Sequence, residues 1–231
     1  MATFVLIPGA GSDSWYWHLV VPELRAAGHD VVAVDLPCDD DAAGLDAYTD
    51  AVVDAIGSRA MTDDLVVVAQ SLGGFTAPLV CERVPVRLMV LVAAMVPTPG
   101  ETFGDWWTNT GQGEDMRAAA IAGGYSVDDF DEAVIFLHDV PATVIEESAA
   151  HMRDQSGTPL ATPWPLDRWP DVPTRFLLCR DDRMFPADFQ RRVVRERLGF
   201  EPDEMPGGHL PALARPHDLA QQLLTYWDAL G

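Results

Sequence analysis

The sequence predicts an α/β fold in which about six mostly parallel strands form one sheet flanked by helices. Strand-like and helix-like segments alternate at both ends of the chain, and the strand-like segments at residues 65–69 and 87–94 are uninterrupted apolar runs, as in strands buried on both faces. Between residues 97 and 172 nothing is typical of a sheet strand. We therefore expect a core domain of residues 1–96 and 173–231, with a helical lid at residues 97–172 inserted after the strand at 87–94.

The first part of the chain alternates strands rich in β-branched residues with helices. Gly28 is expected to end the first helix, and Pro37 to stop the second strand. The expected strands span residues 3–8, 30–36, 65–69 and 87–94, and the expected helices span residues 14–27, 45–56 and 72–83.

After the insertion the alternation resumes. We expect a strand at residues 175–179, a helix at 187–198, a short strand at 200–205 and a closing helix at 217–230. Within the insertion, helical patterns are visible near residues 116–122 and 144–153.

Length and charge restrict the classes of partner. A chain of 231 residues, 48% of them hydrophobic, can bury one substantial core. Its formal net charge of -21 repels phosphate backbones and anionic lipid surfaces. We therefore expect a small-molecule substrate and neither nucleic acid nor a membrane as partner, and a homodimer is left open.

The first residues lack the basic region and the cleavage site of a signal peptide, and no apolar run reaches membrane-spanning length, so a cytoplasmic protein is expected. Cys38, Cys81 and Cys179 are far apart and odd in number, which favours free thiols over a disulfide framework or a structural zinc site. We expect no metal and no organic cofactor.

Ser71 is the candidate nucleophile. It follows the apolar strand at residues 65–69, and helix-forming residues resume directly after it. A strand-to-helix turn that exposes a serine hydroxyl needs small residues two before and two after the serine, and here these are Ala69 and Gly73. A serine that caps a helix would look similar, but the preceding strand favours the nucleophile.

A serine hydroxyl needs a general base and an orienting acid downstream. His209 follows two glycines in the loop after the last expected strand, so it is the candidate base. Asp182 follows the strand at 175–179 and is the candidate acid, with Asp181 as its neighbouring rival. The alternative is that both aspartates merely cap the next helix.

Hydrolysis of an acyl group also needs two backbone donors for the developing oxyanion. The Leu72 N–H, at the start of the helix after Ser71, is one candidate. The other is the Ala10 N–H in the glycine-containing loop after the first strand.

On these residues the chain resembles the α/β-hydrolase superfamily, and within it the compact branch of plant methylesterases and hydroxynitrile lyases. The similar segments are residues 4–17, 94–101, 179–190 and 208–216. The resemblance implies Ser71, His209 and Asp182 as the triad, with Ala10 and Leu72 as oxyanion donors.

Three positions depart from the pattern of that branch. Members usually have histidine where this chain has Pro8, so one brace of the oxyanion loop is expected to be missing, and proline's fixed φ would supply stiffness instead. The lyases have threonine where Gly9 stands and lysine where Leu210 stands. A departing cyanide would therefore lack its stabilisers, and we expect an esterase rather than a lyase.

The hypothesis is hydrolysis of a small, neutral, fairly apolar carboxylic ester through an acyl-serine intermediate. The candidate substrate-binding residues are Gly9, Trp106, Trp107, Phe136, Trp164 and Leu210, although aromatic residues of the lid more often form its core. Two alternatives stay open: a binding or signalling protein that retains the triad with little turnover, and a triad-dependent lyase or cyclase, either similar to hydroxynitrile lyases or acting on a polyketide-like substrate.

Overall fold

Within the residues described by the computed structural model, 1–61 and 64–231, six strands form one sheet in the order β2-β1-β3-β4-β5-β6. The strands are β1 (Ala2–Ile7), β2 (Asp30–Ala33), β3 (Asp64–Gln70), β4 (Leu88–Val92), β5 (Thr174–Cys179) and β6 (Asp203–Met205). Each strand is parallel to its neighbours. The expected α/β architecture is confirmed, and the carboxyl ends of all six strands meet at one edge.

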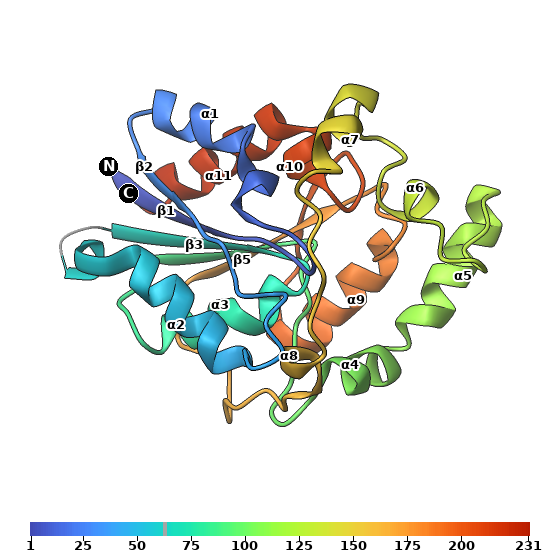
Figure 1. The fold of residues 1–231 in the computed structure, drawn as a ribbon, viewed down its shortest axis with the longest axis horizontal. Coiled ribbons are helices and arrows are strands. Elements are labelled where there is room, and N and C mark those ends of the chain that lie inside the picture. Colours follow the sequence, from blue (N-terminus) through green and yellow to red (C-terminus); the bar gives the residue numbers. More distant parts are fainter. Residues whose placement is uncertain (62–63) are drawn as a thin grey trace.

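Helices cover both faces of this sheet (Figure 1). The helices on one face are α1 (Val20–Ala26), α10 (Pro211–Ala214) and α11 (Pro216–Asp228), and those on the other are α2 (Leu45–Ile56), α3 (Gly73–Cys81) and α9 (Ala187–Leu198). Successive side chains of a strand point to opposite faces, so Phe4 and Leu6 belong to the first core layer while Val5 and Ile7 belong to the second. All four are fully buried, which explains why this part of β1 is apolar on both faces.

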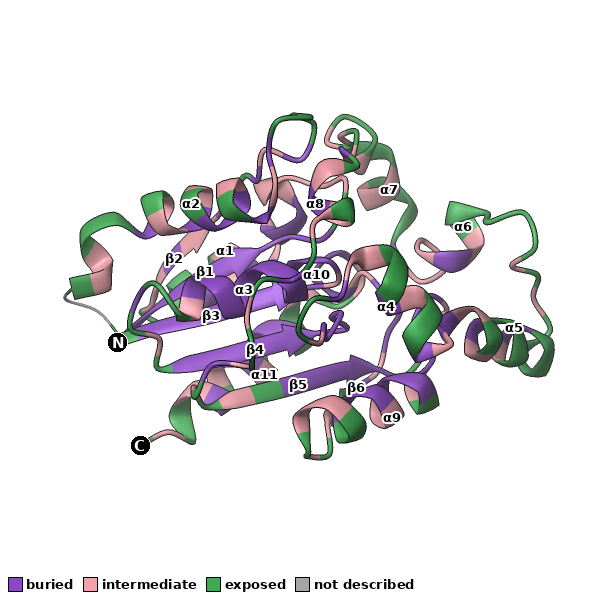
Figure 2. Cartoon of the chain, turned by 90° about the horizontal axis from the view of Figure 1, so that it is seen from below, coloured by how far each residue is buried: buried purple, intermediate pink, exposed green. Residues whose placement is uncertain are grey.

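The insertion between β4 and β5 contains helices and no strand across residues 97–172. Its helices are α4 (Phe103–Thr110), α5 (Gln112–Gly123), α6 (Glu132–Ile135), α7 (Ala142–Ser148) and α8 (Thr158–Ala161). Strands β1, β3, β4 and β5 are buried along most of their length, whereas α5 is mostly exposed or half-buried (Figure 2). The division into a core domain and a lid domain stays a prediction. Among the described residues, every helix is too short or too polar to cross a membrane.

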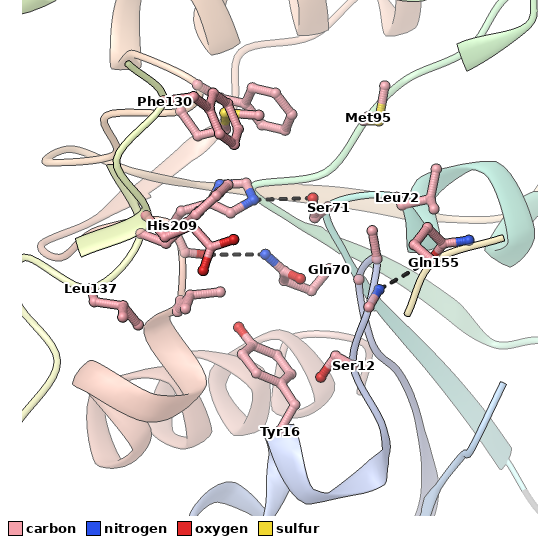
Figure 3. Close-up of a pocket in the computed structure, with 18 of the residues that line it drawn as sticks. Ser12, Tyr16, Gln70, Ser71, Leu72, Met95, Phe130, Leu137, Gln155 and His209 are labelled. Carbon is pink, nitrogen blue, oxygen red and sulfur yellow. Dashed lines mark hydrogen bonds between the residues drawn. The ribbon is translucent and has the colours of Figure 1, made fainter. Parts of the chain in front are cut away.

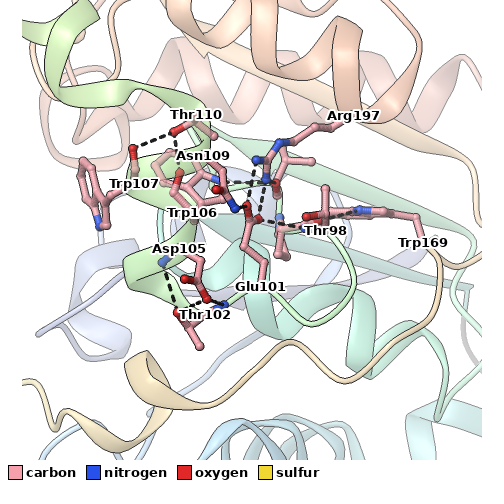
Figure 4. Close-up of polar contacts among 12 residues, drawn as sticks. Thr98, Glu101, Thr102, Asp105, Trp106, Trp107, Asn109, Thr110, Trp169 and Arg197 are labelled. Atoms are coloured by element: carbon pink, nitrogen blue, oxygen red, sulfur yellow. Dashed lines mark hydrogen bonds and ion pairs between the residues drawn. The ribbon is translucent and has the colours of Figure 1, made fainter.

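The insertion is tied to the core by a buried ion pair near its start (Figure 4). The Glu101 carboxylate accepts hydrogen bonds from the Arg197 guanidinium of α9, with Nη1–Oε2 and Nη2–Oε1 distances of 2.6 and 2.9 Å. The Glu101 side chain is 2% exposed and that of Arg197 is 11% exposed. The Asn109 amide and the Thr98 N–H donate to the same carboxylate. Every lone pair of this buried anion therefore has a donor nearby.

The expected first helix at residues 14–27 is corrected to a 3₁₀ turn, η1 (Ser14–Trp17), followed by α1. The Asp13 side chain accepts from the Trp15 N–H and starts the short turn. A continuous helix would place Pro22 in its interior, where the missing N–H loses a hydrogen bond. Starting α1 at Val20 puts Pro22 in the first turn, where that loss has no cost.

The insertion also differs from expectation at α4 and α7. Helix α4 was not expected, although its start carries a capping box in which Thr102 and Asp105 bond to each other's backbone N–H groups. Helix α7 ends at Ser148 rather than at residue 153, because the chain from residue 151 onward leaves the helix and docks on the loop after β1.

Candidate active site

Ser71 lies in a strained turn between β3 and α3. Its φ of 50° is in the left-handed region that non-glycine residues rarely adopt. The turn is crowded, because a Cβ on Gly73 would lie 3.3 Å from the Ala69 Cβ and one on Gly74 would lie 1.9 Å from the Met95 carbonyl oxygen. Small residues on both sides of Ser71 are therefore a packing requirement of this turn, and Ala69 meets it without glycine.

The structure brings the three predicted triad residues into one line of hydrogen bonds. His209 Nε2 lies 3.0 Å from Ser71 Oγ (Figure 3), and on the other side of the ring His209 Nδ1 lies 2.8 Å from Asp182 Oδ2. The side chains of His209 and Asp182 are 3% and 0% exposed. A buried carboxylate beside Nδ1 favours the tautomer with its proton there, which leaves Nε2 free to accept the serine proton.

Asp182 has its other oxygen occupied by the backbone. Oδ1 accepts from the N–H groups of Met184 and Phe185, both at 2.8 Å. Helix α9 begins at Ala187 without a side-chain cap, so neither Asp181 nor Asp182 caps it. The alternative that the two aspartates serve as helix caps is therefore not supported.

Three further side chains hold the loop that carries His209. Asp181 Oδ2 accepts from the Gly207 N–H at 2.8 Å, and Asp139 Oδ2 accepts from the Gly208 N–H at 2.7 Å. The Gln70 amide donates to the His209 carbonyl oxygen at 2.9 Å. Sequence reasoning missed Gln70 and Asp139. The position of Gln70 directly before Ser71 was a usable signal, whereas nothing local marks Asp139 in the insertion.

The two expected oxyanion donors are free to act. Ala10 and Leu72 line the same cavity as Ser71, and within the described residues neither of their N–H groups donates a hydrogen bond to the protein. Leu72 immediately precedes α3, so its N–H lies at the positive end of the helix dipole. Leu72 is buried, and an unpaired backbone donor in a buried place is costly unless a ligand or water accepts from it, whereas Ala10 is exposed.

The cavity above Ser71 has a volume of about 870 Å³. Of the predicted substrate-binding residues, Gly9, Trp107, Phe136 and Leu210 line it. Sequence reasoning missed its methionines, whose flexible side chains suit irregular ligands. They are Met95, Met116, Met152 and Met184.

Trp106 and Trp164 are corrected from substrate-binding to core residues. They are 0% and 1% exposed, and neither lines the cavity. Their indole N–H groups donate to backbone carbonyl oxygens, Trp106 to Val96 and Trp164 to Phe75, both at 3.1 Å. Because the single hydrogen-bond donor of each tryptophan is already bonded inside the protein, it is not available to a substrate.

Aromatic rings pack against the imidazole of His209. The rings of Phe136 and Phe185 lie with their centroids 5.4 and 4.9 Å from that of His209. Tyr16 also lines the cavity, and burial raises the pKa of its hydroxyl well above the ordinary value, so it stays a neutral phenol. Among the described residues, no group of three or more His, Cys, Asp or Glu side chains is placed to hold a metal ion.

Comparison with known proteins identifies the family. A family profile described as "Alpha/beta hydrolase family" matches residues 4–222. The chain belongs to this family. The expected hydrolase fold and class are thereby confirmed.

The relatives of this α/β hydrolase include plant esterases, as the resemblance predicted. "Probable esterase PIR7A" of Oryza sativa subsp. indica is 26% identical over 96% of this chain and 95% of its own length. "Methylesterase 9" of Arabidopsis thaliana is 24% identical over 99% of both chains.

Solved structures share the fold of this α/β hydrolase. The crystal structure of polyneuridine aldehyde esterase matches with a TM-score of 0.80 and 21% identity, covering 98% of this chain and 99% of that one. A pyrethroid hydrolase from Sphingobium faniae JZ-2 matches with a TM-score of 0.76 and 22% identity, covering 99% and 98%.

Proposed function

We propose that this α/β hydrolase is a serine esterase that hydrolyses neutral, apolar small-molecule esters through an acyl-serine intermediate. The observation that carries the proposal is the continuous hydrogen-bonded line from Asp182 through His209 to Ser71, placed beside two unpaired backbone donors in one cavity. Each part of that line has a task in acyl transfer to water.

In the first half of the reaction, Ser71 Oγ attacks the ester carbonyl carbon while His209 Nε2 takes its proton. The carbonyl π electrons move to the oxygen, which accepts hydrogen bonds from the N–H groups of Ala10 and Leu72. Asp182 stabilises the imidazolium. The tetrahedral intermediate then expels the alcohol, which takes the proton from His209, and the acyl group stays on Ser71.

In the second half of the reaction, water attacks the acyl-serine through the same series of steps. His209 takes a proton from the water as its oxygen attacks the acyl carbon, the oxyanion forms again beside Ala10 and Leu72, and Ser71 leaves with the proton from His209. The products are a carboxylic acid and an alcohol. No step needs a group beyond these residues and water.

The cavity supports the substrate class. Its volume of about 870 Å³ suits a drug-sized molecule, and apolar side chains dominate its wall. The names of the relatives agree, since they include methylesterases, a polyneuridine aldehyde esterase and a pyrethroid hydrolase. The esterase names among them support ester cleavage as the reaction proposed for this cavity.

The lyase alternative gains no support from Gly9. A Cβ at this position would lie 2.4 Å from Gln70 Oε1 and 3.0 Å from the Ser71 Cβ. The Gln70 amide is held by the His209 carbonyl oxygen, so a threonine here would disturb the histidine loop. This chain's packing favours glycine, and with it the esterase.

A test of the proposal compares wild-type protein with Ser71→Ala. We expect a fluorophosphonate to label the wild type at Ser71, and neutral p-nitrophenyl esters to be hydrolysed with one atom of labelled water oxygen in the acid. Ser71→Ala should not be labelled and should lose at least about 10³-fold in kcat. Wild-type protein that binds esters without turnover would favour the binding-protein alternative, and products without labelled oxygen would favour a lyase or cyclase.

A further inference from the structure

A short segment of the insertion lies directly on the oxyanion loop. We call residues 151–156, between α7 and α8, the strap, and residues 9–12, which carry Ala10, the oxyanion loop. The Arg153 N–H donates to the Gly11 carbonyl oxygen at 3.0 Å, and the Gly11 N–H donates to Gln155 Oε1 at 3.1 Å. Both polar groups of Gly11 are thus bonded to the strap rather than to the sheet.

Gly11 has the conformation and the space that only glycine allows at this contact. Its φ is +60°, and a Cβ would lie 2.9 Å from the Arg153 carbonyl oxygen. The strap therefore packs against the backbone of the oxyanion loop itself, not against a side chain that could move away.

Further hydrogen bonds fix the strap to the loop after β2. The Arg153 guanidinium donates to the Leu36 carbonyl oxygen at 3.0 Å and pairs with Asp39. The Ser156 N–H donates to the Cys38 carbonyl oxygen at 2.6 Å. These contacts hold the strap against the loop after β2, and Gln155 lies at the same cavity as Ser71 and Leu72 (Figure 3).

The orientation of the Gln155 amide is fixed as well. Its Nε2 donates to Tyr48 Oη and to the Ser156 carbonyl oxygen, both at 3.0 Å. Tyr48 belongs to α2 and is 2% exposed. Because Nε2 has two acceptors, Oε1 is the atom that faces the Gly11 N–H, which needs an acceptor.

We propose that Gln155 is a positioning residue for catalysis, which holds the Ala10–Gly11 peptide so that the neighbouring Ala10 N–H points at the developing oxyanion. The inference rests on the proposed serine esterase function. It assigns to the insertion a second task besides forming the cavity wall, because the oxyanion site is complete only while the strap is docked. Distant elements, α2 and the strap, thereby control a backbone donor on the loop after β1.

The test uses two variants that remove the hydrogen bond in different ways. Gln155→Met keeps the length of the side chain but offers only a weakly accepting sulfur, and Gln155→Asn keeps the amide without the reach. We expect kcat to fall about 10- to 100-fold in both, less than or equal to the loss of a whole oxyanion donor, with KM within about threefold of wild type. Affinity for a trifluoromethyl ketone, which forms an oxyanion on Ser71, should fall in parallel with kcat.

Thr158→Val is the matched control. The Thr158 hydroxyl donates to the Asp41 carbonyl oxygen at 2.7 Å just beyond the strap, and the hydrogen bonds of Thr158 join it to Ser156, Asp41 and Thr162 rather than to the oxyanion loop. We expect its kcat to stay within about twofold of wild type. Urea denaturation of each variant checks that loss of activity is not loss of fold.

The outcomes separate the two proposals. Active wild-type protein with an inactive Ser71→Ala, together with Gln155→Met and Gln155→Asn at wild-type kcat, would overturn the role of Gln155 and leave the esterase in place. A change in KM alone would show that Gln155 contacts substrate and does not position the donor. If Thr158→Val lost as much kcat as the Gln155 variants, the effect would come from general docking of the segment, and the specific role of Gln155 would be overturned. Wild-type protein without turnover would overturn both proposals.

Discussion

At the scale of single residues, Asp182 shows how one carboxylate serves the fold and the site together. Oδ1 accepts from two backbone N–H groups of the following turn, and Oδ2 accepts from His209 Nδ1. The backbone contacts fix where the carboxylate lies, and the remaining oxygen fixes the tautomer of the imidazole. The two tasks use different atoms, so a substitution can separate them.

Asp182→Asn is that substitution. The amide oxygen can keep the bonds from Met184 and Phe185, while the NH₂ group faces His209 Nδ1 and favours the tautomer that cannot take the serine proton. We expect kcat to fall about 10⁴-fold at neutral pH with the urea midpoint little changed. Steady-state kinetics and urea denaturation measure both. Activity within tenfold of wild type would contradict the assigned role of Asp182.

The sequence was sufficient to predict the triad because Ser71, Asp182 and His209 each lie in the turn or loop after a strand, and parallel strands bring such positions to one edge. It was not sufficient for the two tryptophans. Tryptophan occurs both in pocket walls and in cores, so the residue type of Trp106 and Trp164 does not distinguish the two. Only the structure shows that their indole N–H groups donate to backbone carbonyl oxygens of the core. Gln155 was out of reach for a related reason, since its partner Gly11 is 144 residues away.

At the scale of elements, the ranges expected for α2 and α9 agree with the structure, whereas the insertion was predicted less well. Both helices have an apolar face that packs on the sheet, so their periodicity reports their burial. Helix α4 has eight residues and begins with an exposed capping box, and its attachment depends on Glu101 and Arg197, which lie 96 residues apart. Such a contact leaves no local pattern.

Glu101→Gln tests how the insertion is attached. Burial raises the pKa of Glu101, but hydrogen bonds from Arg197, Asn109 and Thr98 outweigh it and hold the pKa below its ordinary value. Removing the charge leaves the Arg197 guanidinium buried without a counter-ion, so we expect the free energy of unfolding to fall by about 3 kcal/mol at pH 7. Urea denaturation measures the difference.

The same variant has a defined pH dependence. Because the folded-state pKa of Glu101 is depressed, its contribution is complete above the unfolded pKa of about 4.3 and is lost as the pH falls through the lower folded value. The stability gap between wild type and Glu101→Gln should therefore be constant from pH 7 to pH 6 and shrink below about pH 4.3. Asp50→Asn, at the exposed pair with Arg83, is the control and should cost at most about 1 kcal/mol. A gap that widens on acidification would contradict the assignment.

At the scale of the whole molecule, the net charge and the apolar cavity both disfavour an anionic substrate. The chain has 36 acidic and 15 basic side chains, and its field is negative at long range. Close to the site, Arg117, Asp128 and Glu132 line the cavity, so acids also outnumber the single arginine there. An ester that carries a carboxylate is repelled during approach and loses solvation in an apolar pocket, and both effects favour a neutral substrate.

Salt separates the two effects, because it screens the long-range repulsion between the protein and an anionic ester but hardly changes interactions inside the pocket. The measurement is kcat/KM for three aryl esters of one acyl chain whose leaving groups are neutral, anionic and cationic, at ionic strengths from 10 mM to 0.5 M. At 10 mM we expect the neutral ester to be preferred over the anionic one by at least about tenfold, and this ratio to fall as the Debye length shortens from about 30 Å to below about 8 Å. The cationic ester should lose rate over the same range while the neutral ester changes by less than about twofold, since repulsion and attraction are screened alike. A preference for the anionic ester at low salt would contradict the expected selection for neutral substrates. Equal kcat/KM values for all three esters at every salt concentration would show that neither the field nor the cavity selects by charge.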